Sequence, residues 1–267
     1  MPPLPLFPYQ HPSNHANASD IIRQHSTNQS DIREVALQGL DLSFASNILD
    51  LGCGFGFMTE SFARRVSPGA RFVGVDAWAA NERPFLDKVE TAGRRGEFVC
   101  KRLRTELPWP DRSFDVVVCS FSLYFFVEIL PEVSRVLSEN GLFLTVAHSE
   151  HHIEEDLKTA GFPEGAPALL DLIRRFSAEN GGDILARAFG KIKRIDYANS
   201  LRFRADQVDD LLAYIRFKLP LMVPGADSDG ELPVQLVKHV RSEMAARGFV
   251  AMEKNDAVFQ CWSPICP

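Results

Sequence analysis

The chain has 267 residues, 45% apolar and 24% charged, as in a globular protein rather than a disordered or fibrous one. Its formal net charge of −6 argues against a nucleic-acid partner, because affinity for phosphates needs clustered Lys and Arg. No apolar stretch approaches the roughly 20 residues that span a bilayer, and the Pro-rich start lacks a basic signal-peptide region. The five cysteines lack metal spacing. We therefore expect a cytoplasmic protein with free thiols and no membrane partner.

The N-terminal residues 1–29 are expected to form an arm on the surface. Ser30 is expected to cap a helix that runs to about Leu40, with Asp31 and Glu34 suited to its first turn. His25 precedes this helix, where it could either touch a substrate or only help to cap.

A glycine-rich segment, Asp50-Leu-Gly-Cys-Gly-Phe-Gly56, follows a short apolar run. Its glycines have no Cβ, so the backbone can turn sharply and a ligand can lie against it. Asp76 comes twenty residues after the last of these glycines, at the end of a second apolar run. A carboxylate at that point can accept hydrogen bonds from ribose hydroxyls. The two features together predict a site for a nucleotide-like ligand.

The spacing of these glycines distinguishes two ligands. A dinucleotide site normally has G-x-G-x-x-G, with a pyrophosphate at the helix N-terminus. Here the glycines run G-x-G-x-G, and Asp50 opens the motif. This carboxylate would repel a diphosphate but suits a ligand that carries an ammonium group. A nicotinamide-dependent oxidoreductase would also need a proton donor such as a Tyr/Lys pair, and none is apparent.

Strands then alternate with helices along the chain. The pattern predicts strands near 47–51, 71–75, 96–100, 114–120 and 141–147, and helices near 57–66, 82–93, 126–137 and 151–160. Further helices are predicted at 166–178, 205–218 and 232–247, and further strands at 192–203 and 257–262. This alternation predicts an α/β fold, doubly wound, with a mostly parallel sheet covered on both faces.

The segment from about Ile32 to His148 resembles the S-adenosylmethionine-dependent methyltransferases of the Rossmann-like class (class I). Besides the glycine segment and Asp76, the stretch 107–118 is similar to that family's "LPF-x-D-x-x-FD" segment, and 137–145 to its "L-x-x-G-G" turn. The resemblance implies seven strands with an antiparallel last strand, and a helical lid inserted between late strands. It also implies transfer of a methyl group from S-adenosyl-L-methionine, which leaves S-adenosyl-L-homocysteine, to a small-molecule acceptor.

On this basis the chain divides into three parts. Residues 1–29 are the arm, and the methyltransferase core comprises 30–163, 190–204 and 255–263. Residues 164–189 and 205–254 are the helical lid that covers the substrate, because ligands of open α/β sheets bind at the carboxyl edge of the strands.

The resemblance also assigns residues to the site. The cofactor is expected to contact Asp50, Gly52, Cys53, Gly54, Gly56, Asp76, Ala77, Leu103 and Ser120. Leu103 departs from the family, which usually has a polar residue facing the adenine. The expected substrate contacts are His25, Phe121, Tyr124 and His152. The candidate catalytic residues are His148, His151 and Tyr124. No metal site is expected from the histidines, since adjacent residues on a helix face different ways.

Three matters stay open at this point. The methylated atom is an oxygen, nitrogen or carbon. An RNA or protein methyltransferase is one alternative function, and a non-catalytic methyltransferase-like partner protein is another, supported only by Leu103 at the adenine position. The chain is expected to be a monomer or a homodimer.

Overall fold

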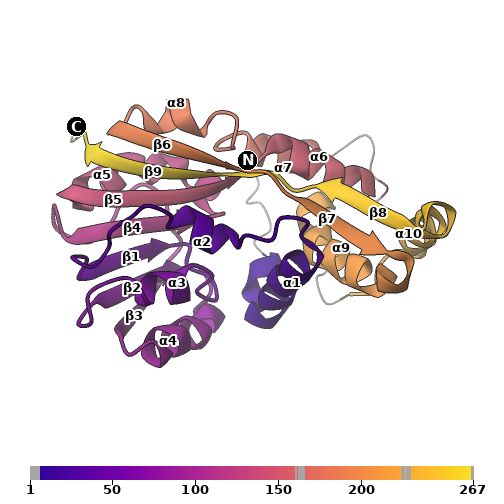
Figure 1. Cartoon of the computed structure of the whole chain (residues 1–267), viewed down its shortest axis with the longest axis horizontal. Helices are drawn as coiled ribbons and strands as arrows, with labels where there is room; N and C mark the ends of the chain where they lie inside the picture. Colours follow the sequence, from indigo (N-terminus) through magenta and orange to yellow (C-terminus); the bar gives the residue numbers. More distant parts are fainter. Residues whose placement is uncertain (1–6, 160, 162–165, 224–225, 227–229, 266–267) are drawn as a thin grey trace.

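The computed structural model describes residues 7–159, 161, 166–223, 226 and 230–265. A seven-stranded sheet forms one end of the elongated molecule (Figure 1). In sheet order its strands are β3 (Arg95–Cys100), β2 (Arg71–Asp76), β1 (Asn47–Leu51), β4 (Phe114–Ser120), β5 (Leu137–His148), β9 (Asp256–Pro264) and β6 (Phe189–Tyr197). Strands β1 to β5 pair in parallel, and β9 runs antiparallel to both of its neighbours. The expected mostly parallel sheet with an antiparallel last strand is confirmed.

Helices cover both faces of this sheet, as alternating strands and helices require. The helices are α1 (Pro12–His25), α2 (Ile32–Ala36), α3 (Thr59–Ala63), α4 (Glu82–Thr91), α5 (Leu130–Val136), α6 (Glu150–Thr159), α7 (Pro167–Ile173), α8 (Gly181–Leu185), α9 (Val208–Met222) and α10 (Val234–Arg247). Short 3-10 turns are η1 (Phe7–Gln10), η2 (Ala79–Asn81), η3 (Leu123–Phe125), η4 (Val127–Ile129) and η5 (Ala205–Gln207). Because successive strand side chains point to opposite faces, Ile48 and Leu49 enter two different apolar cores.

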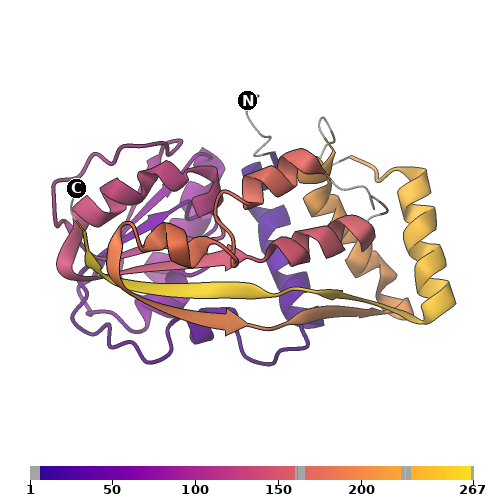
Figure 2. The same cartoon turned by 90° about the horizontal axis from the view of Figure 1, so that it is seen from above.

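A second, two-stranded sheet was not predicted. It consists of β7 (Ser200–Arg204) and β8 (Phe249–Glu253), which pair antiparallel. Strand β6 continues into β7 and β8 into β9, so that a long ribbon runs the length of the molecule (Figure 2). The single strand predicted at 192–203 is therefore wrong. Asn199 breaks it, because its backbone N–H donates to the Asn255 side chain and its own side chain accepts from the backbone N–H of Asn28.

The N-terminal segment also differs from the prediction. Residues 12–25 form helix α1, which packs against α9 and buries Ala18, Ile21 and His25, so this stretch is not a surface arm. Residues 1–6 lie outside the described residues. The next helix, α2, has five residues, and its cap is Asp31 rather than Ser30, since the Asp31 side chain accepts from the backbone N–H of Arg33.

The expected lid has several parts with different surroundings. Helix α8 packs on β6 and β9 and so covers part of the main sheet, whereas α9 contacts α1 and η1, and α10 contacts β8 and α9. Residues 160, 162–165, 224–225 and 227–229, which the core and lid boundaries include, lie outside the described part. Across the described residues, no helix combines the length and apolar character needed to cross a bilayer. Cys53, Cys100, Cys119 and Cys261 are free thiols.

Candidate active site

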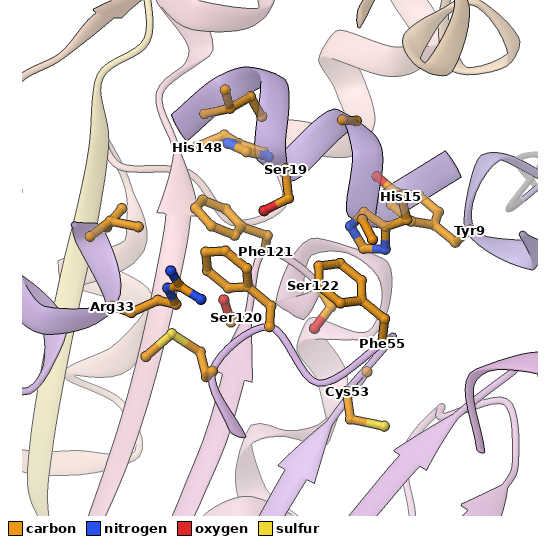
Figure 3. Close-up of a pocket in the computed structure, with 18 of the residues that line it drawn as sticks. Tyr9, His15, Ser19, Arg33, Cys53, Phe55, Ser120, Phe121, Ser122 and His148 are labelled. Carbon is orange, nitrogen blue, oxygen red and sulfur yellow. The ribbon is translucent and has the colours of Figure 1, made fainter. Parts of the chain in front are cut away.

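A cavity of about 1300 Å³ lies at the carboxyl ends of the parallel strands. Helix α1 passes over it, and His15 and Ser19 point from this helix toward Phe55 and Phe121 below (Figure 3). Ligand pockets for one small molecule usually measure about 300–1,000 Å³. The cavity is therefore large enough for a nucleotide-sized molecule and a second ligand.

The glycine-rich turn forms the floor of this cavity. Gly52, Gly54 and Gly56 have φ values of 66°, 50° and 79°, which side chains with a Cβ rarely adopt. A Cβ at Gly52 would lie 2.6 Å from the Ser122 Oγ, so this glycine is required by packing as well. At Gly54 a Cβ would have only the His15 ring near it, at 3.5 Å. The backbone of Gly54 therefore faces the space beneath α1.

The carboxylate of Asp76 is held in one orientation. Its Oδ2 accepts a hydrogen bond from the backbone N–H of Gly54 at 3.0 Å. Its Oδ1 accepts one from the backbone N–H of Trp78 at 2.9 Å and one from the side-chain Nδ2 of Asn81 at 3.0 Å. Burial raises the pKa of Asp76, although these hydrogen bonds oppose the change. A carboxylate offers about four lone-pair sites, so one site on Oδ2 stays open toward the cavity.

Asp50, at the end of β1, is the most perturbed carboxyl group of the cavity floor. Burial and the nearby charge of Asp76 raise its pKa from 3.8 to about 7. Lys88, on α4, lies near the same floor, where its Nζ donates to the Gly56 carbonyl at 3.2 Å and sits 4.3 Å from the centre of the Phe55 ring. Burial lowers the pKa of Lys88 to about 8.

The remaining predicted cofactor residues, with the exception of Gly56, also line the cavity. They are Cys53, Ala77, Leu103 and Ser120. Two polar atoms of the lining, the Ser120 Oγ and the Trp78 Nε1, are buried without a hydrogen-bond partner among the described residues. Buried polar groups are normally paired, so these two atoms are available to a ligand.

On the other side of Ser120 lies a second group of side chains, around Phe121. The Phe121 ring stacks on His148 with a centroid separation of 4.5 Å. The His148 Nδ1 lies 2.9 Å from the Asp256 Oδ1, and the Lys254 Nζ donates to the Asp256 Oδ2 at 2.7 Å. Phe121, His148, Lys254 and Asp256 all line the cavity.

Two other predicted residues lie outside the cavity. His25 does not line the cavity; its Nε2 pairs with Asp210 at 2.9 Å, and its ring stacks on Phe203. His151 is exposed on α6 beside Glu154. The structure therefore places neither His25, predicted as a substrate contact, nor His151, predicted as a catalytic residue, in the lining of the cavity.

Tyr124 and His152 lie behind the cavity wall rather than in it. Tyr124 borders a small adjoining space, where burial and Tyr9 raise the pKa of its hydroxyl well above its usual value. His152 is fully buried, and its Nε2 lies 3.3 Å from the Tyr214 hydroxyl. Neither residue is therefore placed to contact a ligand in the cavity directly.

Several lining residues were missed at the level of sequence. His15 has an edge-on contact with Phe55 and stacks on Phe217, and its Nδ1 is buried without a partner among the described residues. Burial lowers its pKa to about 4, so the ring is neutral near pH 7. Lys254 was assigned only to the lid and Asp256 only to the core, because no motif marks them.

Known proteins resemble this chain mainly in its first half. Residues 48–141 match the family described as the methyltransferase domain. A 112-residue stretch is 30% identical to an uncharacterised methyltransferase, YcgJ, of Bacillus subtilis (strain 168), covering 41% of this chain and 42% of that protein. A 109-residue stretch is 32% identical to trans-aconitate 2-methyltransferase of Paracidovorax citrulli (strain AAC00-1), covering 40% of each.

The likeness to solved structures extends further along the chain. The YcgJ structure superposes with a TM-score of 0.52 at 16% identity, over 93% of this chain and 98% of that one. At such identity the superposition establishes a common fold and nothing finer. The curated relatives named above are matched over only about two fifths of their own length.

Proposed function

We propose that this chain is a class I S-adenosylmethionine-dependent methyltransferase and that it transfers the methyl group of S-adenosylmethionine to a small-molecule acceptor by in-line displacement. One observation carries the proposal. The positive-φ glycine turn lies between two buried carboxylates, Asp50 and Asp76, on the floor of a cavity of about 1300 Å³. Trans-aconitate 2-methyltransferase, a relative by sequence, is named for a small acceptor, which is consistent with this class of substrate.

The residues of the floor fit S-adenosylmethionine. Asp76 would accept a ribose hydroxyl at the open site on Oδ2, and a second hydroxyl would have to share Oδ1 with the Asn81 side chain. The unpaired Ser120 Oγ and Trp78 Nε1 would gain partners from the ligand. Ala77 and Leu103 would flank the adenine, with backbone groups near Leu103 in place of the family's polar side chain.

Asp50 would hold the cationic end of the methionine portion. With its pKa raised to about 7, Asp50 would be about half protonated near pH 7 beside a neutral ligand, whereas an ammonium group nearby favours the carboxylate. Gly54, like Asp50, lines the cavity, so the backbone of the turn borders the space that this chain would occupy.

When bound, S-adenosylmethionine supplies an electrophilic methyl carbon on a positively charged sulfur, with a neutral thioether as leaving group. The protein then has to align the acceptor and exclude water. Aromatic rings from separate elements do this around the cavity: Tyr9, Phe55, Phe121, Phe125 and Phe217. Helices α1 and α9, which pack on each other, act as the cover, with Phe217 and Lys218 of α9 in the lining.

Calorimetry with S-adenosylmethionine and S-adenosylhomocysteine tests the cofactor half of the proposal. Replacing Asp76 with Ala should weaken binding by about 1.5–3 kcal/mol, the scale of a hydrogen bond to a charged group, which is roughly 10- to 150-fold. Asp196→Asn is the control, because Asp196 is exposed, pairs with Arg194 and does not line the cavity. If wild-type protein binds neither compound, or if Asp76→Ala binds as wild type does, the assignment of this floor to the cofactor fails.

A further inference from the structure

Three polar side chains meet on the side of the cavity away from the glycine turn. His148 ends β5, Asp256 begins β9, and Lys254 lies in the short turn between β8 and β9. The two oxygens of Asp256 are divided between the other two residues, Oδ1 to the His148 Nδ1 and Oδ2 to the Lys254 Nζ. One carboxylate therefore orients both an imidazole and an ammonium group.

The protonation of His148 follows from this arrangement. Although burial raises the pKa of Asp256, Lys254 and His148 together hold it below its ordinary value, so Asp256 is a carboxylate and can only accept. Burial lowers the pKa of His148 to about 3, so the ring is neutral without ligand. The His148 Nδ1 then carries the hydrogen, and the lone pair lies on Nε2. The described residues provide no hydrogen-bond partner for this Nε2, and the ring lines the cavity.

Lys254 is a buried cation with spare donors. Its side chain is only 4% exposed, and Asp256 is its single hydrogen-bond acceptor in the described part of the chain. An ammonium group has three donors. The Nζ also lies 5.3 Å from the centre of the Phe121 ring, which brings it to the same wall as His148.

Phe121 links this group to the proposed cofactor floor. It directly follows Ser120 and has a φ of 55°, an uncommon backbone conformation for a bulky side chain. Strain of this kind persists only where the surrounding structure holds it, and it is frequent at functional sites. Here the Phe121 ring stacks on His148 and lies beside Lys254.

We propose that His148 and Lys254 form the acceptor site for an acidic hydroxyl group, that of a phenol, an enol or a carboxylic acid, and that Asp256 is the residue that positions both. This inference rests on the proposed methyltransferase function and selects oxygen as the atom methylated. His148 is the catalytic base through Nε2, and Lys254 binds the oxygen as it becomes negative.

The proton balance of this step is complete. The hydroxyl proton passes to the His148 Nε2, and the resulting oxyanion is held by the Lys254 ammonium. The oxygen then bonds to the methyl carbon as the bond from that carbon to sulfur breaks, and the electron pair of that bond stays on sulfur. His148 afterwards releases its proton to solvent. No further reactant is needed.

A metal ion is the competing use of these residues. One ligand atom each from His148, His152 and Asp256 lies within 4.8 Å of the others. However, Lys254 donates to the free oxygen of Asp256 and would repel a cation, and the His152 Nε2 already faces the Tyr214 hydroxyl. The hydrogen-bonded arrangement accounts for all of these contacts.

The test uses 4-nitrophenol, whose neutral and ionised forms differ in visible absorption, bound to the protein saturated with S-adenosylhomocysteine. An opposite charge within about 4–6 Å lowers an acid's pKa by roughly 1–3 pH units, so the bound probe should ionise that far below its value in water. The other titratable groups around His148 are Lys254, Asp256, His152 and Tyr124, and the titration must be fitted with them in mind.

Variants at Lys254 separate charge from packing. Lys254→Gln and Lys254→Met should abolish the early ionisation of the probe, whereas Lys254→Arg should retain it. Lys191→Met is the control, because Lys191 is exposed on β6 and lies over the Trp262 ring. A wild-type protein that does not bind the probe, or binds it in the neutral form, overturns the inference whatever the variants do.

Calorimetry with S-adenosylhomocysteine distinguishes failure here from failure of the proposed function. Lys254→Gln should bind this compound with unchanged affinity, since the contacts of Lys254 are with Asp256 and Phe121 rather than with the glycine turn or Asp76. Asp256→Asn should change the probe's titration in the same preparation, because His148 and Lys254 both lose their charged partner. An unchanged titration in Asp256→Asn contradicts the positioning role.

Discussion

A substitution at Asp50 tests whether the carboxylate that would bind the ligand also lowers the stability of the protein without ligand. It is 5% exposed, and burial together with the charge of Asp76 raises its pKa to about 7. We expect Asp50→Asn to stabilise the protein without ligand at neutral and alkaline pH, since Asn needs no ionisation. The same substitution should weaken binding of S-adenosylhomocysteine, because the ligand's ammonium group loses a charged partner.

The size of the effect follows from the pKa in the two states. In the unfolded chain Asp50 ionises near 3.8, and in the folded protein near 7. Between these values the folded state holds the proton and the unfolded state does not, so stability falls as pH rises. From pH 5 to pH 8 the wild type should therefore lose about 2–3 kcal/mol relative to Asp50→Asn, at 1.36 kcal/mol for each pH unit below 7. For a chain of this size that is roughly 5–10 °C in Tm.

Urea or thermal unfolding at pH 5 and pH 8 measures this difference. Comparing the two pH values removes any offset caused by the amide itself. Asp171→Asn, an exposed carboxylate on α7, should give no such difference between the two pH values. If Asp50→Asn and wild type respond equally to pH, then Asp50 is ionised in the folded protein and the argument from its burial is wrong.

Two further comparisons test the packing of the site. Gly52→Ala should lower the free energy of unfolding by about 2–4 kcal/mol, because the new Cβ would lie 2.6 Å from the Ser122 Oγ. Gly93→Ala is the control: Gly93 has a similar φ of 68°, but its Cβ would meet nothing within 4 Å, so the loss should be only about 1 kcal/mol. Equal losses by urea unfolding would mean that φ alone matters. His25→Ala should lose about 1–3 kcal/mol with its hydrogen bond to Asp210 and its ring stacking, and His151→Ala should stay within about 0.5 kcal/mol.

The cofactor floor was predictable because its requirements are local. A strand, a glycine turn and a helix follow one another in the chain, and the three glycines adopt the positive φ values that the motif requires. Asp76 ends the neighbouring parallel strand, and Asp50 pairs with Gly74 two residues before it. Adjacent parallel strands bring their carboxyl ends to one edge, so spacing in the sequence became proximity in space.

The cover of the cavity was not predictable in the same way. Helix α1 has a low apolar content, and it buries Ala18, Ile21 and His25 only because α9, nearly two hundred residues later, packs against it. His25 illustrates the consequence: its polar ring is satisfied by Asp210 and the Arg202 carbonyl, partners that no local pattern indicates. A histidine near a predicted site was therefore assigned to the substrate although it holds two distant elements together.

The proposed acceptor site depends on a chain reversal that sequence patterns hide. Lys254 and Asp256 reach His148 because β9 inserts antiparallel between β5 and β6, which pairs Asp256 with His148 and with Tyr197. The turn before β9 is fixed by side chains, since Asn255 accepts the backbone N–H of Asn199. The alternation of residues in the sequence continues across the breaks between β6 and β7 and between β8 and β9, so it gives no sign of either break. The charged pair at 254 and 256 thus has no local signature, although two residues two apart on an extended chain share one face and can both turn to the cavity.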